Sequence, residues 1–260
     1  MPTSGIAKVF LSAALLVLAA RSGDAADSAA EMSRGDALYQ QGRLADARAA
    51  YRAALDSLPG SYAALCRLAH VESEMGEDAR GDPQRELMAA AVEHARAAVA
   101  TAPDSAEGHV WLAVALGRQA LKEGPRTRLS LSREIKSEVD RGIALDPGIP
   151  RAYHVRALWN RKLATLNAVE RAVANAVLGG VPKGASMENA VRDLQKAVTL
   201  EPENVNHHLE LGRTYSMLKD RAGAIRELEK AIALPPTSGP RDSIYQSEAK
   251  GLLRKLPRPS

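Results

Sequence analysis

The residues with the clearest chemical potential are six histidines, because their ring nitrogens bind metal ions and exchange protons near neutral pH. They are His70, His94, His109, His154, His207 and His208. Adjacent side chains on a helix point about 100° apart, so the last two would diverge. We expect none of them to pair with a second histidine or a carboxylate at the i, i+4 spacing of a zinc-binding helix. We therefore expect packing or surface roles for all six, and we predict no metal site.

Other short features favour structure over catalysis. The segment "GGVPKGAS", residues 179–186, resembles a phosphate-binding loop, but Lys precedes Gly and no strand pattern comes before it. Cys66 is the only cysteine and falls in an apolar helix face, which favours a small core residue over the alternative of a reactive thiol. No nucleophile and histidine occur together in a supporting context. We expect no catalytic residue and no cofactor.

Charge is segregated along the chain. Residues 72–86 contain six acidic and two basic side chains, whereas residues 118–136 contain six basic and two acidic ones. Residues 151–171 contain five basic side chains and one acidic one. Solvation of lengthened helices explains such runs, and the functional alternative is an anionic partner, either an acidic peptide or anionic phospholipid. The partner contacts that we expect are Arg118, Lys122, Asn160, Lys162 and Arg213.

The segment "LATLNAVERAVANAVLGG", residues 163–180, has apolar side chains at helical spacing. Such a stripe must be buried against something. Packing onto neighbouring helices is the first interpretation. The alternative is an apolar groove for an acyl chain, which would be lined by Leu166, Val169, Val173 and Val177.

The elements that must position these residues are all helical. Alanine is frequent, alternating runs of Val and Ile are missing, and Gly and Pro fall between the helical patterns. The stretch "LELGRTYSMLKDRAGAIRELEKAIALPP", residues 209–236, matches the tetratricopeptide repeat, a helix hairpin of roughly 34 residues. Gly212, Ala224 and Ala231 would let its two helices approach closely, and Pro236 would end the second one.

Prolines after four similar helices set the length of the other repeats. They are Pro59, Pro103, Pro147 and Pro202, at intervals of 44, 44 and 55 residues. The predicted fold is an all-α solenoid of about five tetratricopeptide-like hairpins, three of them with lengthened helices, although the extra residues could instead lengthen the turn between the two helices. The repeats are expected at about 28–61, 62–105, 106–149, 150–204 and 205–238. An amphipathic helix over residues 242–256 would cap the stack, since a terminal repeat otherwise exposes an apolar face.

The first 26 residues are typical of a targeting segment. Lys8 precedes the apolar run from Val9 to Ala20, and Gly23 to Ala25 offers small residues for cleavage. That run is short for a membrane-spanning helix, which needs about 20 residues. We predict a signal peptide over residues 1–26 and a periplasmic or secreted domain over residues 27–260. The alternative is an uncleaved anchor in the inner membrane, the only case in which we expect membrane contact.

The overall composition excludes a typical nucleic-acid-binding protein. The formal net charge of +4 is mild for 260 residues, and aromatic residues make up only 3% of the chain. Proteins that bind nucleic acids usually combine a strongly basic surface with aromatic side chains on which bases stack. We therefore expect no nucleic-acid partner.

Four stretches carry a family resemblance: "LCRLAHVESE", "AVEHARAAVATAPDSAEGHVWLAVAL", "HVRALWNRKLATLNAVERAVANAVLGGVPKGASMENAVRDLQKAVTLEP" and "LELGRTYSMLKD". In the third, His154, Trp159, Arg171, Ala174 and Pro182 have the family's relative spacing. From about residue 62 to the C-terminus, the chain resembles the regulator of microtubule dynamics family. The resemblance implies a divergent tetratricopeptide domain.

The resemblance also implies partners. Animal members of that family are microtubule-associated, and one branch tethers organelles and binds phospholipid through its repeat domain. An exported chain does not meet tubulin, so only the lipid role carries over as a hypothesis. Our first hypothesis is a non-enzymatic scaffold that binds a protein or an acidic peptide on its concave surface. The alternative is a phospholipid-binding or lipid-transfer module that uses an apolar groove near the insertion of the fourth repeat.

Overall fold

The computed structural model describes the backbone of residues 5–178, 180, 182–237 and 239–256; within these ranges it describes side chains from residue 23 onward, except 173 and 176–178. This part of the chain forms twelve α-helices and no strand. Their bounds are α1 (Gly5–Gln40), α2 (Leu44–Ser57), α3 (Tyr62–Asp78), α4 (Gly81–Thr101), α5 (Ala106–Ala120), α6 (Pro125–Leu145), α7 (Pro150–Ala164), α8 (Ala168–Leu178), α9 (Met187–Leu200), α10 (Val205–Met217), α11 (Arg221–Ala233) and α12 (Asp242–Lys255).

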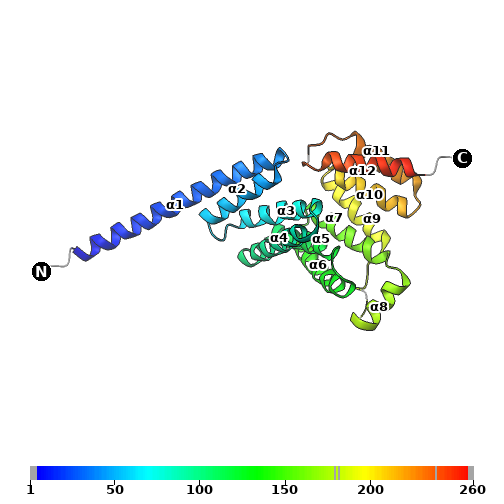
Figure 1. Ribbon diagram of the computed structural model, residues 1–260, viewed down its shortest axis with the longest axis horizontal. Helices are drawn as coiled ribbons and strands as arrows, with labels where there is room; N and C mark the ends of the chain where they lie inside the picture. Colours follow the sequence, from blue (N-terminus) through cyan, green and yellow to red (C-terminus); the bar gives the residue numbers. More distant parts are fainter. Residues whose placement is uncertain (1–4, 179, 181, 238, 257–260) are drawn as a thin grey trace.

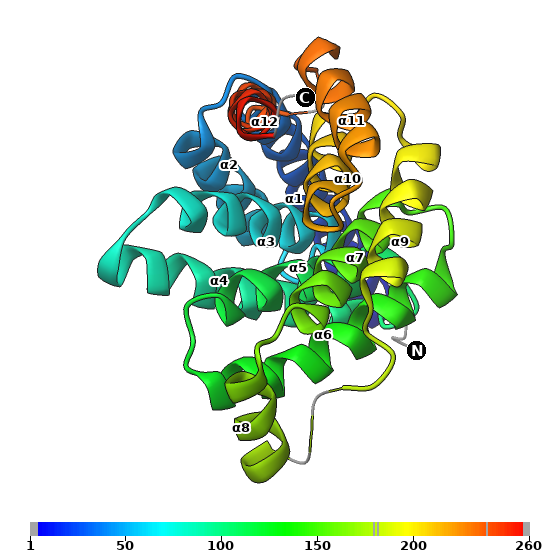
Figure 2. The same cartoon turned by 90° about the vertical axis from the view of Figure 1, so that its right-hand side faces the viewer.

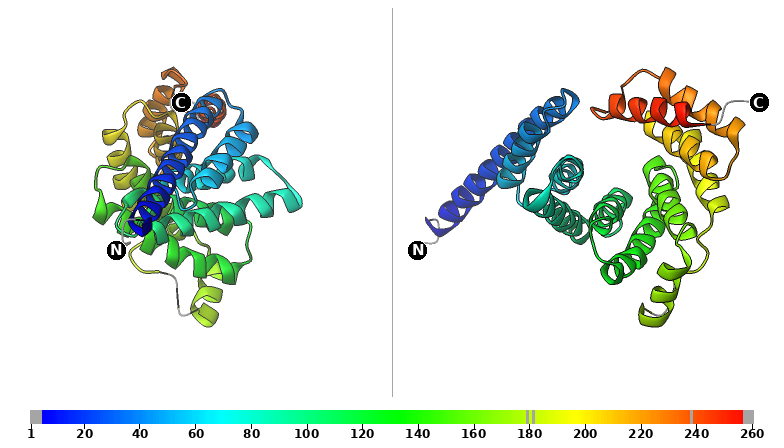
Figure 3. Two further views of the ribbon diagram at one scale, coloured as in Figure 1. Left: turned by 90° about the vertical axis from the view of Figure 1, so that its left-hand side faces the viewer. Right: turned by 45° about the vertical axis from the view of Figure 1, so that its right-hand side comes forward.

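The helices pair in sequence order as hairpins: α1 with α2, α3 with α4, α5 with α6, α7 with α9, and α10 with α11. Each hairpin packs on the next, and the stack curves so that the first helix of each hairpin faces the inner, concave side (Figure 1, Figure 3). Figure 2 shows α12 end-on beside α10 and α11, where it covers the last repeat, with α8 at the opposite edge of the molecule. The predicted all-α solenoid of five hairpins and a cap is confirmed.

The inserted residues are accommodated in two different ways. In repeats two and three they lengthen the second helix, so that α4 and α6 contain 21 residues each. In repeat four, α7 and α9 keep 15 and 14 residues, and the insertion forms the separate 11-residue helix α8. The expectation of lengthened helices is therefore wrong for repeat four, because its extra residues leave the hairpin and build a helix beside α6.

Small residues set the distance between the two helices of a hairpin. A Cβ atom on Gly212 would lie 2.8 Å from Cγ of Leu228, and one on Gly142 would lie 2.7 Å from Cγ2 of Val110. Ala224 and Ala231, at two of the predicted contact positions, are completely buried. Helices that approach this closely leave no room for a larger side chain, which is why the repeat needs these residue types.

The same hydrogen bond recurs in the turns between repeats. In three repeats, the side chain six residues after the proline contacts the carbonyl oxygen of that proline: His109 with Pro103 at 2.8 Å, Tyr153 with Pro147 at 3.1 Å, and His208 with Pro202 at 2.9 Å. The second ring nitrogen of the two histidines faces a carboxylate of the following helix, Glu138 or Glu227. The two histidines therefore tie a repeat's first helix both to the turn before it and to its partner helix, whereas Tyr153 ties it to the turn.

The first helix crosses the predicted end of the signal peptide. α1 runs without a break from Gly5 to Gln40, and its first part extends away from the stack (Figure 1). Its last part packs on α2, where the Ser28 hydroxyl donates to the Ala54 carbonyl oxygen at 2.8 Å and the Tyr51 hydroxyl donates to Asp36 at 2.8 Å. Within the described residues, no helix combines the length and apolar character that a membrane span requires.

Candidate functional site

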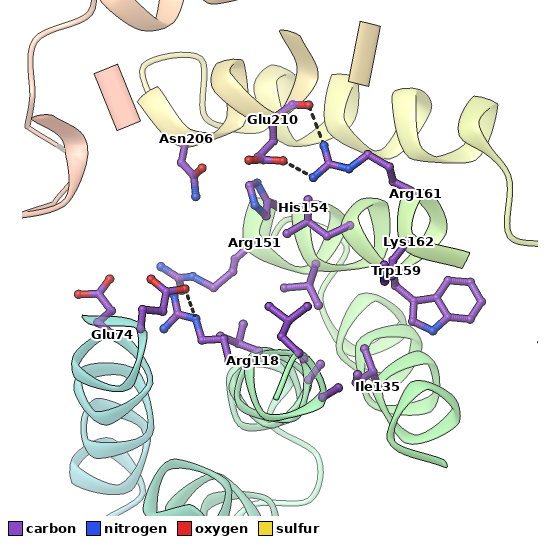
Figure 4. A pocket seen from close by; sticks show the side chains of 18 of the residues that line it. Glu74, Arg118, Ile135, Arg151, His154, Trp159, Arg161, Lys162, Asn206 and Glu210 are labelled. Atoms are coloured by element: carbon purple, nitrogen blue, oxygen red, sulfur yellow. Dashed lines mark hydrogen bonds and ion pairs between the residues drawn. The ribbon is translucent and has the colours of Figure 1, made fainter. Parts of the chain in front are cut away.

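The concave side encloses a cavity of about 1250 Å³. Its walls come mainly from the first helix of each repeat, α1, α3, α5, α7 and α10, with α6, α8 and α12 completing them. Because every repeat delivers the same helix to the same side, residues far apart in the sequence face one space. Figure 4 shows Glu74, Arg118, Arg151 and Glu210 approaching this space from four different helices.

Four planar side chains, one from each of the first four repeats, form a row on one wall of the cavity. The rings of Tyr39 and His70 lie 4.9 Å apart, those of His70 and Trp111 stack at 4.1 Å, and the Arg151 guanidinium lies 4.2 Å from the Trp111 ring centre. Arg151 is exposed to the cavity, and no carboxylate among the described residues forms an ion pair with it. A cation over an aromatic face is attracted by the ring, so the row holds a positive charge that is available to a ligand.

Buried polar atoms without a hydrogen-bond partner are concentrated in the cavity. Among the described residues, four of these side-chain atoms belong to cavity-lining residues: Oε2 of Glu74, Nη1 of Arg118, Nε2 of His207 and Nε of Arg241. Buried polar groups in native proteins nearly always have partners. This group contains an acceptor as well as donors, and because the atoms are buried, a ligand reaches them only when the surrounding side chains move.

Glu74 and His70 form one polar contact in this end. Burial alone would raise the pKa of Glu74, but the contact with His70 at 3.2 Å and the charge of Arg118 hold that pKa below its usual value. Burial lowers the pKa of His70, despite the opposing effect of Glu74. The two residues are four positions apart on α3, so the expectation that no histidine pairs with a carboxylate at this spacing is wrong.

His154 of α7 and His207 of α10 meet at the junction of repeats four and five. Their Nδ1 atoms lie 2.9 Å apart, so one ring donates a hydrogen bond to the other. Burial, the second imidazole and Arg161 lower the pKa of His154 well below its usual value. Burial also lowers the pKa of His207, although Glu201, 3.2 Å from Nε2, opposes the shift. That contact is too poorly aligned to count as a hydrogen bond, and the pair is neutral at neutral pH.

The other end of the cavity is apolar. Figure 4 shows Ile135 and Trp159 on the side away from Glu74. Three large apolar side chains that line the cavity remain unusually exposed: Leu121 at 64%, Val169 at 73% and Met217 at 48%. These three side chains leave apolar surface open to the cavity.

Three of the five predicted partner contacts line the cavity. Arg118 pairs with Glu77 at 2.9 Å, Arg213 pairs with Glu248 at 2.7 Å, and Lys162 is exposed. Each of them comes from the first helix of its repeat. The structure therefore brings these three residues to one space from α5, α7 and α10.

The other two predicted contacts lie elsewhere. Lys122 is exposed in the turn after α5 and does not line the cavity. Asn160 is only 4% exposed, and its side-chain amide donates to Asp193 at 3.1 Å. Arg156 contacts the same carboxylate at 2.7 Å and 2.9 Å. Asn160 therefore belongs to the polar core between α7 and α9, and its prediction as a partner contact is wrong because the phase of α7 turns it inward.

The structure describes the side chains of two of the four residues that would line an apolar groove for lipid. Leu166 and Val169 line the cavity. The side chains of Val173 and Val177 lie outside the described residues. On the same segment, Arg171 donates to the carbonyl oxygens of Leu163 and Leu166, so this arginine closes the end of α7.

The cavity as a whole is not basic, although the inserted segments are. Acidic and basic side chains line it in equal number. Several of the basic residues are held by internal partners, as Arg161 is by the Glu210 carboxylate and the Thr214 hydroxyl. Basic runs in the sequence therefore serve to join repeats as well as to present charge.

No metal centre is visible in the part of the chain that the structure describes, where no three His, Cys, Asp or Glu side chains are placed to share an ion. The segment that resembles a phosphate loop connects α8 to α9, and two of its residues lie outside the described ranges.

Comparisons with known proteins agree with this architecture. The family model "Regulator of microtubule dynamics protein 1-3" matches residues 32–257. Regulator of microtubule dynamics protein 1 of Caenorhabditis elegans is 26% identical over 74% of this chain and 82% of that protein. Regulator of microtubule dynamics protein 3 of Rattus norvegicus is 28% identical over 72% of this chain, which corresponds to 40% of that longer protein.

Solved structures share the fold. TTC0263, a thermophilic TPR protein of Thermus thermophilus, matches with a TM-score of 0.64 at 20% identity, over 86% of this chain and 98% of that one. PilW, a type IV pilus biogenesis factor, matches with a TM-score of 0.53 at 16% identity, over 87% of this chain and 92% of that one. Since the family model extends from within α1 to the end of α12, the chain belongs to the regulator of microtubule dynamics family.

Proposed function

We propose that this protein is a non-enzymatic interaction module that binds a peptide segment of a partner protein in its concave cavity. The volume of about 1250 Å³ exceeds the roughly 300–1,000 Å³ of small-molecule pockets. A site of that size, walled by all five repeats, suits an extended segment better than a small substrate.

The observation that carries the proposal is the mixture of unpaired donors and acceptors at the polar end. Oε2 of Glu74 is an acceptor and Nη1 of Arg118 is a donor without a partner among the described residues, and Arg151 is exposed and has no ion-pair partner among them. A peptide backbone offers one N–H donor and one C=O acceptor at each residue, so it matches both kinds. The equal number of acidic and basic side chains gives no support to an acidic partner in particular.

Selection from a random peptide library on the purified protein tests this proposal. For a selected peptide, we expect Arg151→Gln to weaken the Kd by about 10-fold or more, because a hydrogen bond to a charged group contributes about 1.5–3 kcal/mol. Lys122→Gln is the matched control, since it removes a basic side chain outside the cavity, and its Kd should not change. Failure to select any peptide, or equal effects of the two substitutions, would contradict the proposal. Isothermal titration calorimetry provides the measurement.

A second candidate function is a phospholipid-binding or lipid-transfer module. It is favoured by the exposed apolar side chains of Leu121, Val169 and Met217, which would contact acyl chains while the polar end holds the headgroup. Native mass spectrometry of the purified protein separates the two functions. Co-purified phospholipid that is lost in a Val169→Asp variant would favour the lipid module, and a lipid-free protein that binds selected peptides would exclude it.

We also propose that the mature domain acts outside the cytoplasm, after cleavage near residue 26. The support is the charged, apolar and small-residue order of the N-terminal segment. N-terminal sequencing of protein from fractionated cells tests cleavage and location together. An intact Met1 in the membrane fraction would favour the uncleaved anchor, and a cytoplasmic product would contradict export. A role at microtubules does not follow for an exported chain.

A further inference from the structure

The two ends of the solenoid touch each other through a small polar contact. Arg241 precedes α12, and its guanidinium lies 2.8 Å from Asp78 Oδ2 and 3.2 Å from Glu77 Oε2, at the C-terminal end of α3. The arginine and Asp78 are 163 residues apart in the sequence. Figures 1 and 3 both show the start of α12 close to the turn between α1 and α2. The contact therefore closes the curved stack into a ring around the cavity.

The contact is largely shielded from solvent, and neighbouring segments approach it closely. The Arg241 side chain is only 12% exposed. Next to it, a Cβ atom on Gly42 would lie 3.7 Å from Cβ of Pro240, and one on Gly239 would lie 3.5 Å from the Tyr39 hydroxyl. Burial opposes the charge of Arg241, but the carboxylates of Glu77 and Asp78 hold its pKa above the usual value. The closure is therefore formed by ion pairs at a point where backbone segments approach closely.

This closure differs in kind from the joints between successive repeats. Those joints bury apolar side chains such as Leu116, Val139 and Leu194, which are completely buried, and apolar burial is the main stabilising contribution to packing. The closure instead depends on the charges of three side chains, of which Arg241 is 12% and Asp78 is 60% exposed. It therefore involves far fewer side chains than those joints, and salt screens it only in part because the ion pairs are partly buried. The ring therefore has one weak joint, and opening it there leaves every repeat intact.

The joint is linked directly to the cavity through Glu77. One oxygen of this carboxylate lies 2.9 Å from Nε of Arg118, and the other contacts Arg241. Arg118 lines the cavity and has the unpaired Nη1 atom. A ligand that draws Arg118 toward itself must therefore change the carboxylate on which the closure depends.

We propose that Arg241, Glu77 and Asp78 form a clasp that opens to admit a partner segment into the cavity and closes around it. The gating role rests on the proposed function, whereas the opening itself does not require a ligand. A gate controls entry and exit alike, so weakening it raises both rate constants, while weakening an ordinary contact mainly raises the dissociation rate.

Distances between two spin labels test the clasp without any ligand. Ala45 and Ser247 are exposed residues on opposite sides of the joint, and Cys66, which is 1% exposed, is replaced by Ala to give single labelling sites. We expect a narrow distance distribution at low salt, a longer and broader one for Arg241→Gln, and a partial return for Arg241→Lys. Arg254→Gln, an exposed arginine on the same helix, is the matched control and should not differ from the parent.

A second variant tests whether the loss of the ion pairs, and not the change of the arginine side chain itself, alters the distances. The Glu77→Gln, Asp78→Asn double substitution leaves Arg241 in place and should widen the distribution in the same way, with an unchanged circular dichroism spectrum. Identical distributions in the parent and both clasp variants would overturn the clasp, even if peptides bind. Should no peptide bind, the proposed function fails and the distances still decide whether the clasp exists.

Stopped-flow binding of a selected peptide tests the gate. We expect Arg241→Gln to raise the association and dissociation rate constants together, by about tenfold each, with little change in Kd. A change in the dissociation rate constant alone would make Arg241 an ordinary contact residue and would overturn gating.

Discussion

At the scale of single residues, the histidines hold helices together. Each contacts a carboxylate or a second ring: His70 with Glu74, His94 with Glu72, His109 with Glu138, His154 with His207, and His208 with Glu227. A buried polar ring is tolerated when its nitrogens have partners. A scattered set of histidines in the sequence thus becomes a set of polar joints within and between repeats, in keeping with the packing role that we expected.

Acid should destabilise the protein through His154 and His207. Both have a folded-state pKa below the usual value, so the unfolded chain binds more protons as the pH falls. Their contribution to stability is complete above about pH 6.5 and is lost below it. We expect the free energy of unfolding, measured in urea, to fall as the pH is lowered from about 7.5 to 5.5, with the larger share from His154, whose pKa is lowered further.

The control for the acid effect is a His154→Gln, His207→Gln double variant. This variant lacks both titrating rings, so its free energy of unfolding should change less over the same pH interval. An equal loss in the parent and the variant would show that other groups, such as carboxylates, cause the acid sensitivity.

At the scale of the element, glycine fixes how closely two helices pack. Gly212 of α10 faces Leu228 of α11, with space for a hydrogen atom but not for a methyl group. A Cβ atom on Gly251 of α12 would instead point into open space, with no neighbouring side chain within 4 Å. Glycine is therefore needed for close packing in α10, whereas in α12 it only lowers the stability of the helix relative to alanine.

The substitution of these two glycines by alanine should have opposite effects. Gly212→Ala forces the Leu228 side chain and backbone to move, and we expect it to cost about 1–3 kcal/mol. Gly251→Ala meets no obstacle, and we expect it to stabilise the protein by up to about 1 kcal/mol. Urea unfolding monitored by circular dichroism measures both, and destabilisation by Gly251→Ala would show a contact that this geometry lacks.

At the scale of the whole molecule, the C-terminal helix has two tasks. It covers the apolar face of repeat five through Ala249, which is completely buried among Val205, Leu209 and Leu228. It also places Arg241 at the joint with α3. Because α12 packs on the face of repeat five where a further repeat would stack, the burial of that face and the ring closure both depend on this one helix.

A charge in the interface of the cap should therefore open the C-terminal end. Ala249→Asp buries an unpaired carboxylate, and we expect it to cost about 3 kcal/mol or more. Lys250→Asp introduces the same side chain one residue later at an exposed position and should have little effect. Hydrogen exchange should increase in α10 and α11 of the first variant, and protection that is unchanged there would contradict the capping role.

The sequence alone determined the order and type of the helices, because a helix and its ends depend on residues within a few positions of each other. The proline intervals and the small residues at Gly212 and Ala224 predicted the hairpins and their close approach. The insertion of repeat four was predicted to lengthen the helices or the turn between them, and local patterns could not decide between these and the separate helix α8.

Only the tertiary structure decided which side chains share the cavity. Asn160 and Lys162 lie two positions apart, yet one is buried beside Asp193 and the other is exposed to the cavity. Two positions on a helix point in nearly opposite directions, so the sequence predicts that the two side chains part, but only the packing of α9 on α7 decides which of them is buried. The contact of Arg241 with Asp78 depends on more still, since the small rotations of several successive repeats add up before the two ends meet. These rotations arise from packing between repeats, so a local sequence pattern does not predict where the two ends meet.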